Sequence, residues 1–482
     1  MAEAQAQNFN RLLTEVKQFD VTGKTLLIPN MAPFATQVLG GCFRAVGVKA
    51  KIMETYKGLT LGKEFTSGKE CFPCQVTLGD ILYFLKNEKE RLGPAFSPEN
   101  YVYFLPEADG PCRFGMYNKM QRLVLDRFPE FRDIPITYLS TRNAYSTAEI
   151  MPAKASSIFR KLSYVGIITA DILDRTVWRV RPYELRPGMT DSFMEKALEA
   201  VTAEIEEKGA SLDFKGLHSL VGDIVSTART FIDDRQPRRP LIGIVGEIYV
   251  RTHPESNQHI VQLLERFGGE VVVASIAEWI NYITYDMARD LKRNFKLAWL
   301  NRDVALARET IPKLAATLLE KYYQLFRQHQ GYANALKHLD IEKDHRIGTL
   351  ERRLEKNHLF NFDIGTESGL SIGAALEQVH EGYDGVVNVF PFTCMPSAIC
   401  TAVLKPLLNK IQMPYLDAPY DGAIQPNREI ALRTFMYQAK QRQEARTAGK
   451  NRNGRQNVIS NNGNKRDPSG GISDCGARRS HP

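Results

Sequence analysis

Four cysteines of this chain stand in surroundings that suit metal binding. Cys71 and Cys74 lie three residues apart, Cys112 follows a Gly-Pro pair, and Cys394 lies between two prolines. Each has a proline within two residues and comes just before a predicted helix or just after a predicted strand. Four thiolates are the ligand set of a 4Fe-4S cluster or of a structural zinc ion. The cysteines therefore predict a metal centre.

The spacing of the cysteines favours a cluster over the other uses of paired thiols. A structural zinc ion usually takes two close C-x-x-C pairs within one small module. Here Cys394 lies about 280 residues after Cys112, so the ligands come from distant segments. A dithiol redox role for Cys71 and Cys74 and a set of unrelated reduced thiols remain alternatives. The favoured hypothesis is a cluster in a cleft between two domains.

The elements that must position these residues follow an α/β order. Apolar strands alternate with helices, and we expect them at 24–29, 49–54, 101–105, 135–139, 241–246, 270–274, 385–389 and 414–416. Cys112 and Cys394 each follow the carboxyl end of such a strand. Open α/β sheets bind their ligands at that edge.

The predicted fold class is α/β, with two or more Rossmann-like parallel-sheet domains, a helical insertion and a disordered C-terminal tail. The first α/β domain spans 1–150 and carries the loops of Cys71, Cys74 and Cys112. A mainly helical insertion follows at 151–238. The second α/β domain spans 239–440 and contains a helical excursion at 284–357 and the Cys394 loop. A basic tail occupies 441–482.

The composition is that of a globular protein, with 43% hydrophobic and 24% charged residues. No apolar run approaches the roughly 20 residues that span a bilayer. The polar N-terminus lacks the pattern of a signal peptide. We therefore expect a cytoplasmic location, no membrane contact, and cysteines that are reduced or metal-bound.

The net charge of +8 does not indicate a nucleic-acid partner. Residues 440–482 hold ten Lys/Arg against three Asp/Glu, so the rest of the chain carries a net charge of only +1. The basic residues belong to a segment rich in Asn, Gly and Ser, which is typical of a solvated disordered tail.

Five short motifs occur in a fixed order along the chain. They are Gly68-Lys69-Glu70-Cys71-Phe72-Pro73-Cys74, Gly110-Pro111-Cys112-Arg113-Phe114-Gly115, Arg181-Pro182-Tyr183-Glu184, Gly246-Glu247-Ile248-Tyr249-Val250-Arg251 and Pro391-Phe392-Thr393-Cys394-Met395-Pro396. Together they resemble the acyl-CoA dehydratase activase-related family. These are kin of 2-hydroxyacyl-CoA dehydratases, of benzoyl-CoA reductases and of the C-terminal part of large CoA-enzyme activases. The resemblance covers roughly residues 20–440.

The resemblance implies a 4Fe-4S cluster at the junction of Rossmann-like domains, with Cys71, Cys74, Cys112 and Cys394 as candidate ligands. The dehydratases use three cysteine ligands and leave one iron open to substrate. Four thiolates here would close the cluster and favour electron transfer, whereas a Cys74 outside the ligand set would leave one iron open. Both alternatives remain.

A double-cubane cluster needs more thiols than these four. Only Cys42 and Cys400 remain in the body of the chain, and both lie on predicted helices. A buried cysteine on a helix is usually a small core residue. We therefore expect a single cluster.

Four further residues are candidates for contacts with the cofactor. Arg113 adjoins Cys112 and could tune the charge and potential of a cluster. Glu247, Tyr249 and Arg251 follow a strand end and could face the same cleft, with Arg251 binding a phosphate or carboxylate or forming a structural ion pair. Residues 363–369 superficially resemble the phosphate loop of actin-like ATPases, but a helix follows where that motif has a β-hairpin.

The leading hypothesis is an iron–sulfur protein of the 2-hydroxyacyl-CoA dehydratase/activase superfamily. It would take part in ATP-driven low-potential electron transfer or in reductive chemistry. An ATP-hydrolysing activase with its own cluster would be the partner, and a small molecule or an acyl-CoA the substrate. The alternatives are a non-catalytic scaffold or regulatory subunit of an activase complex, and a zinc-stabilised binding protein. The catalytic residues and self-association stay open.

Overall fold

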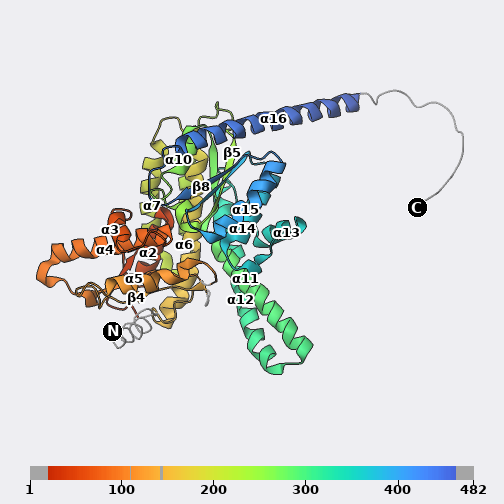
Figure 1. The fold of residues 1–482 in the computed structure, drawn as a ribbon. Coiled ribbons are helices and arrows are strands. Elements are labelled where there is room, and N and C mark those ends of the chain that lie inside the picture. Colours follow the sequence, from red (N-terminus) through yellow and green to blue (C-terminus); the bar gives the residue numbers. More distant parts are fainter. Residues whose placement is uncertain (1–19, 109, 142–144, 463–482) are drawn as a thin grey trace, which may run out of the picture.

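Two parallel sheets organise the chain in the computed structural model, which describes residues 20–108, 110–141 and 145–462 (Figure 1). The first sheet has the order β2-β1-β3-β4 and the second the order β6-β5-β7-β8, with every neighbouring pair parallel. The strands are β1 (Thr25–Ile28), β2 (Lys49–Ile52), β3 (Tyr101–Phe104), β4 (Ile136–Thr137), β5 (Leu241–Gly246), β6 (Glu270–Val273), β7 (Gly385–Pro391) and β8 (Tyr415–Tyr420). The predicted α/β class with two Rossmann-like sheets is confirmed.

Helices cover both faces of the first sheet because β1, β3 and β4 are largely apolar on both sides, whereas the edge strand β2 carries two lysines. Leu26 and Ile28 of β1 pack into one core together with α2 (Pro33–Ala45). Leu27 points the other way, into a second core with α4 (Phe72–Leu92) and α5 (Tyr117–Leu125). The short helix α3 (Leu59–Glu64) packs against α4.

The second sheet is covered in the same way. Ile242 and Ile244 of β5 pack into a core with α9 (Ile248–Thr252), α10 (Ile260–Arg266) and α16 (Arg428–Asn462). Val245 faces the opposite core, which is built with α13 (Ile347–Lys356), α14 (Glu367–Glu381) and α15 (Met395–Lys410). Gly246 ends β5 with φ +115°, and a Cβ there would lie 2.2 Å from the carbonyl oxygen of Val389 on β7. Only glycine allows the two backbones to approach so closely.

Three long helices link the two sheets. They are α6 (Ala153–Val180), α7 (Met189–Lys208) and α8 (Lys215–Arg229), within the range expected to be helical. The α6 side chains Val165 and Ile168 share a core with the first sheet. The α6 carboxylate of Asp171 accepts hydrogen bonds from the backbone N–H groups of Ile276 and Ala277, which follow the end of β6. Helix α6 therefore contacts both halves.

Two antiparallel helices form a hairpin within the second half. They are α11 (Ile276–Asn301) and α12 (Val304–Ala335), and the outer end of the hairpin projects from the body in Figure 1. Among the residues that the structure describes, none of the helices is both long enough and apolar enough to cross a membrane.

The segment predicted as a disordered basic tail, 441–482, lies only in part within the described residues. Helix α16 continues through residues 441–462, which were expected to lack structure. Its Gln, Arg, Glu, Ala and Lys residues are good helix formers, and their polarity does not prevent an exposed helix. The rest of the expected tail, 463–482, lies outside the described residues.

Candidate metal centre

The carboxyl ends of strands from both sheets border one cavity of about 350 Å³. Cys71, Cys112 and Cys394 line it, together with Glu247 and Glu367. We call it the thiol cavity. Cys112 follows β3 and Cys394 follows β7, which hold the same place in the strand order of their sheets. The structure therefore brings together thiols that are far apart in sequence, at the sheet edge where α/β proteins bind ligands.

Each of these three cysteines stands at the start of a helix. Cys71 is the N-cap residue of α4 and Cys394 that of α15, while Cys112 precedes a 3-10 turn, Arg113–Met116, that leads into α5. Backbone N–H groups at the start of the following helix hydrogen-bond two of the thiols: that of Phe114 bonds Cys112 and that of Ser397 bonds Cys394. The N–H groups at helix N-termini favour negative charge, so three such ends suit an anionic group.

Cys74 does not line the thiol cavity, although it belongs to the same C-x-x-C pair. The sequence placed it in a loop, but α4 begins at Phe72, because Pro73 needs no hydrogen-bond donor in the first turn of a helix. The Cys74 side chain is 2% exposed and packs in the core below the first sheet. Its Sγ lies 3.9 Å from Met120 Sδ and 4.0 Å from Gln121 Nε2.

Arg113 ties the three cysteine loops together. Its guanidinium donates hydrogen bonds to the carbonyl oxygen of Lys69, at 2.6 Å, and to the carbonyl oxygen and hydroxyl of Thr393, at 2.8 and 2.7 Å. Lys69 precedes Cys71 by two residues, and Thr393 adjoins Cys394. One side chain next to Cys112 therefore links all three loops, and its positive charge offsets a small part of the rise in the pKa of the Cys71 thiol that burial causes.

Two carboxyl groups border the thiols. Burial and, to a smaller extent, the neighbouring charge of Glu247 raise the pKa of Glu367 to about 7. Burial also raises the pKa of Glu247, although this carboxylate accepts hydrogen bonds from the N–H groups of Tyr249 and Val250. Near neutral pH, Glu367 can hold or release a proton at the wall of the cavity.

The surroundings keep the free thiols protonated at neutral pH. Burial raises the pKa of Cys71 and of Cys112 well above the ordinary value, and it raises that of Cys394 to about 12. The charges of Glu247 and Glu367 act in the same direction. Dithiol redox sites instead lower the pKa of the attacking thiol. Burial raises the pKa of Cys74 to about 12 as well, so neither thiol of the pair is activated and the arrangement does not favour a thiol–disulfide role.

The other predicted contact residues separate into two groups. Tyr249 lines the cavity and stacks on His253, with ring centroids 4.8 Å apart. Arg251 is buried away from it and donates hydrogen bonds to the carbonyl oxygens of Gly246 and Ser275. Arg251 therefore braces the backbone at the ends of β5 and β6, and it is not placed to bind a phosphate in the cavity.

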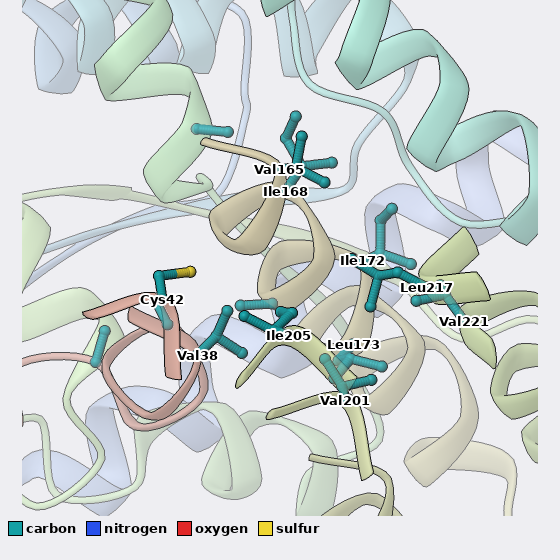
Figure 2. Close-up of a cluster of buried hydrophobic side chains, with 14 of the residues drawn as sticks. Val38, Cys42, Val165, Ile168, Ile172, Leu173, Val201, Ile205, Leu217 and Val221 are labelled. Carbon is teal, nitrogen blue, oxygen red and sulfur yellow. The ribbon is translucent and has the colours of Figure 1, made fainter. Parts of the chain in front are cut away.

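The remaining cysteines of the body lie in hydrophobic cores. Figure 2 shows Cys42 on α2 among the side chains Val38 and Ile205, with its thiol pointing into the helical layer. Cys400 is buried on α15, and its Sγ lies 3.7 Å from the carbonyl oxygen of Ser368. Neither lines the thiol cavity, so the thiols available there match one cluster with three thiolates.

The donor set fits an iron–sulfur cluster in its chemistry. Thiols are the ligands that such clusters use, and the Tyr117 hydroxyl hydrogen-bonds the sulfur of Cys71, a contact that tunes cluster potentials. Within the described part of the chain, no three His, Cys, Asp or Glu side chains are grouped closely enough to hold a single metal ion. The thiolates of a 4Fe-4S cluster bind different iron atoms, so they stand further apart than the ligands of a single ion.

Sequence reasoning missed several residues of the cavity. Glu367 lies in the 363–369 segment, which was considered only for its likeness to a phosphate loop. Tyr117 follows Cys112 by five residues without any motif of its own. Tyr164 and Trp279, on α6 and α11, form part of the apolar wall. In the sequence, both residues belong to helices with an apolar side, and this pattern is the same whether the side faces a cavity or a hydrophobic core.

Comparison with protein-family models and with curated proteins finds no match to this chain. The family resemblance therefore depends on the five short motifs and on their order along the chain. Three of these motifs supply the cysteines of the thiol cavity, and a fourth supplies Glu247 and Tyr249.

Proposed function

We propose that the protein binds one 4Fe-4S cluster in the thiol cavity through Cys71, Cys112 and Cys394. It would use an electron from an ATP-hydrolysing activase for reductive chemistry on a small molecule, or pass that electron on. The observation that carries the proposal is the convergence of three thiols, from loops spread over more than 300 residues, on one cavity. A cytoplasmic location is part of the same proposal.

The position of Cys74 favours three thiolate ligands over four. Its side chain is buried and faces Met120 and Gln121, and it does not line the cavity. Binding a cluster in the cavity through Cys74 would require the side chain to leave these contacts in the core. A bound cluster would supply low-potential electrons and, with three thiolates, one iron open to the cavity. This arrangement favours direct substrate chemistry over pure electron transfer.

The chain itself supplies the other requirements of a reductive site. The apolar walls exclude water and leave a volume within the range of small-molecule sites. Glu367 can hold or give up a proton near pH 7, so it is the side chain best placed to accompany electron transfer with proton transfer. Arg113 holds the cysteine loops at a fixed spacing.

Anaerobic reconstitution with iron and sulfide tests the proposal directly. We expect about four iron and four sulfide per chain and an EPR signal after reduction. A protein that stays free of iron, or that is purified with zinc and resists reconstitution, would refute the cluster. A zinc-containing protein would support the alternative of a zinc-stabilised binding protein.

Serine variants separate the two ligand sets. We expect Cys71→Ser, Cys112→Ser and Cys394→Ser to lose most of the iron, and Cys74→Ser to retain it. Cys42→Ser is the matched control, because it also buries a hydroxyl group in a core away from the cavity. If folded Cys74→Ser lost as much iron as Cys71→Ser, the cluster would have four thiolate ligands.

A further inference from the structure

Helix α12 carries a continuous apolar stripe on its outer surface. The exposed fractions are 73% for Val304, 71% for Leu319 and 69% for Tyr322, which are unusual for large apolar side chains on one helix. At 100° per residue, these side chains and their neighbours fall within one third of the helix circumference. The members of this α12 stripe are Val304, Ile311, Ala315, Leu318, Leu319, Tyr322, Leu325 and Phe326.

The stripe is not the face that holds the hairpin together. Thr317 and Gln324 lie on the opposite side of α12 and are buried against α11, where Gln324 Nε2 donates to Thr284 Oγ1 at 2.9 Å. A third side of the helix meets α6, through the Tyr323 hydroxyl and the carbonyl oxygen of Lys161. The packing within the described chain thus leaves the stripe uncovered.

Charge is nearly absent from the stripe. Between Val304 and Phe326, Arg308 is the one ionisable Lys, Arg, Asp or Glu side chain on this side of α12. Glu309 and Lys313 lie outside it and pair with each other at 2.7 Å. A surface of this kind suits another apolar helix and does not suit a nucleic acid or an acidic peptide.

Part of the stripe is spaced symmetrically about Ala315, its smallest member, whereas Leu318 and Leu325 have Pro312 and Ala305 at the mirror positions. Counted from Ala315, Ile311 and Leu319 lie four residues away on either side. Arg308 and Tyr322 lie seven residues away, and Val304 and Phe326 eleven. If two such helices run antiparallel, with the alanines facing each other, Val304 meets Phe326 and Ile311 meets Leu319.

We propose that the α12 stripe is the contact surface of a homodimer, in which α12 of one copy packs antiparallel against α12 of a second copy. A two-fold axis would pass beside Ala315. A two-fold interface requires a surface complementary to itself, and the symmetrical spacing provides one. The small central residue allows close approach, and Arg308 would stack on Tyr322 of the second copy by a cation–π contact. A different partner protein would require no such symmetry.

The surface is large enough for a stable dimer. Six bulky side chains of the stripe are exposed by 41% or more. Together they offer apolar area of the same order as the roughly 800 Å² per partner that standard interfaces bury. Figure 1 shows the hairpin extending away from the body, where a second hairpin can approach it.

Disulfide crosslinking of the full chain with one introduced cysteine tests both contact and direction, and Cys475, outside the described residues, is replaced by serine in every variant. Ala315→Cys is expected to form a disulfide-linked dimer alone. Ile311→Cys and Leu319→Cys are each expected to remain uncrosslinked alone and to crosslink when the two are mixed. In the antiparallel pair, the two copies of residue 319 lie about 12 Å apart along the helix, beyond the ~7 Å between Cα atoms that a disulfide spans.

The oligomeric state of the unmodified chain gives a second test. We expect a dimer by light scattering and sedimentation, and Leu319→Glu should raise the dimer dissociation constant by about 100-fold or more. Ala316→Glu is the matched control, because this exposed residue lies on the flank of the stripe and should leave the dimer intact. A monomer at all concentrations overturns the proposal. Crosslinking of Leu319→Cys with itself overturns the antiparallel direction.

Discussion

Replacing Gly79 by alanine should destabilise the first half of the protein. Gly79 lies in the middle of α4, where it faces Gly58 at the start of α3. A Cβ on Gly79 would lie 2.2 Å from the carbonyl oxygen of Gly58. That is more than 1 Å short of the 3.4 Å at which ordinary contact begins, and the obstacle is backbone that cannot rotate away. The two helices must separate to accept the methyl group.

The size of the effect follows from two opposing terms. Overpacking of a closed contact costs about 1–3 kcal/mol, and a backbone obstacle places this site at the upper end. Alanine inside a helix has a higher helix propensity than glycine, which raises the free energy of unfolding by up to ~1 kcal/mol. The net loss is about 2 kcal/mol, which corresponds to a thermal midpoint lower by about 4–8 °C for a domain of this size. Thermal unfolding followed by circular dichroism measures it.

Gly222→Ala provides the matched control. Gly222 also lies inside a long helix, α8, but a Cβ there meets its nearest neighbours only at 3.9 Å. The same substitution should therefore raise the midpoint slightly through helix propensity alone. If Gly79→Ala proved as stable as Gly222→Ala, the close packing of α3 on α4 would be refuted.

Two further predictions concern a positioning residue and a buried histidine. Arg113→Gln should lower iron affinity in reconstitution titrations by about 10-fold or more, because the loops of Cys71 and Cys394 lose their shared donor. His345 lies between Glu278 and Glu381; burial lowers its pKa, but these two hydrogen-bonded carboxylates outweigh burial and raise it to about 10. The charged His345 therefore stabilises the folded protein fully below pH 6.5, and this contribution is lost as the pH rises through 10. His345→Gln should lower the free energy of unfolding by on the order of 2–3 kcal/mol at pH 6.5. It should also flatten the dependence of the free energy of unfolding on pH between pH 6.5 and 10.

Each of these two changes has its own control. Arg91→Gln removes an arginine that pairs with Glu88 on the surface of α4, and it should leave iron binding unchanged. Arg113→Gln with full iron affinity would show that the loops keep their spacing without it. For the histidine, denaturant unfolding at a series of pH values compares both proteins. Equal slopes of stability against pH would contradict the assigned charge of His345.

Most of the strands could be predicted from the sequence because they are buried on both faces. Runs such as Leu241–Gly246 and Tyr101–Phe104 are almost wholly apolar, and turn residues flank them. All eight expected strands are found, β5 with the expected ends and the other seven with shifted ends. The start of α4 was misplaced, because Pro73 was taken as part of a loop, whereas proline is well accepted in a first helical turn.

The candidate site was predictable only in part. The motifs singled out the four cysteines, but nothing in the spacing of Cys71 and Cys74 says which thiol faces the cavity. That difference depends on where α4 begins: Cys71 is the N-cap residue with an extended backbone and lines the cavity, whereas Cys74 is already inside the first turn of the helix. Glu367 reaches the cavity only through the packing of α14 in the second half, and tertiary contacts of this kind leave no local signal.

Helix α6 sets the distance between the two sheets. Its 28 residues extend about 42 Å, and it packs on the first sheet at one side and on β6 and α11 at the other. The distance between the Cys112 and Cys394 loops therefore depends on the rigid helix α6 as well as on the loops themselves. Inserting one residue into α6 would rotate everything that follows by about 100°. A change in the length of α6 would therefore disturb the thiol cavity, although other elements build most of its wall.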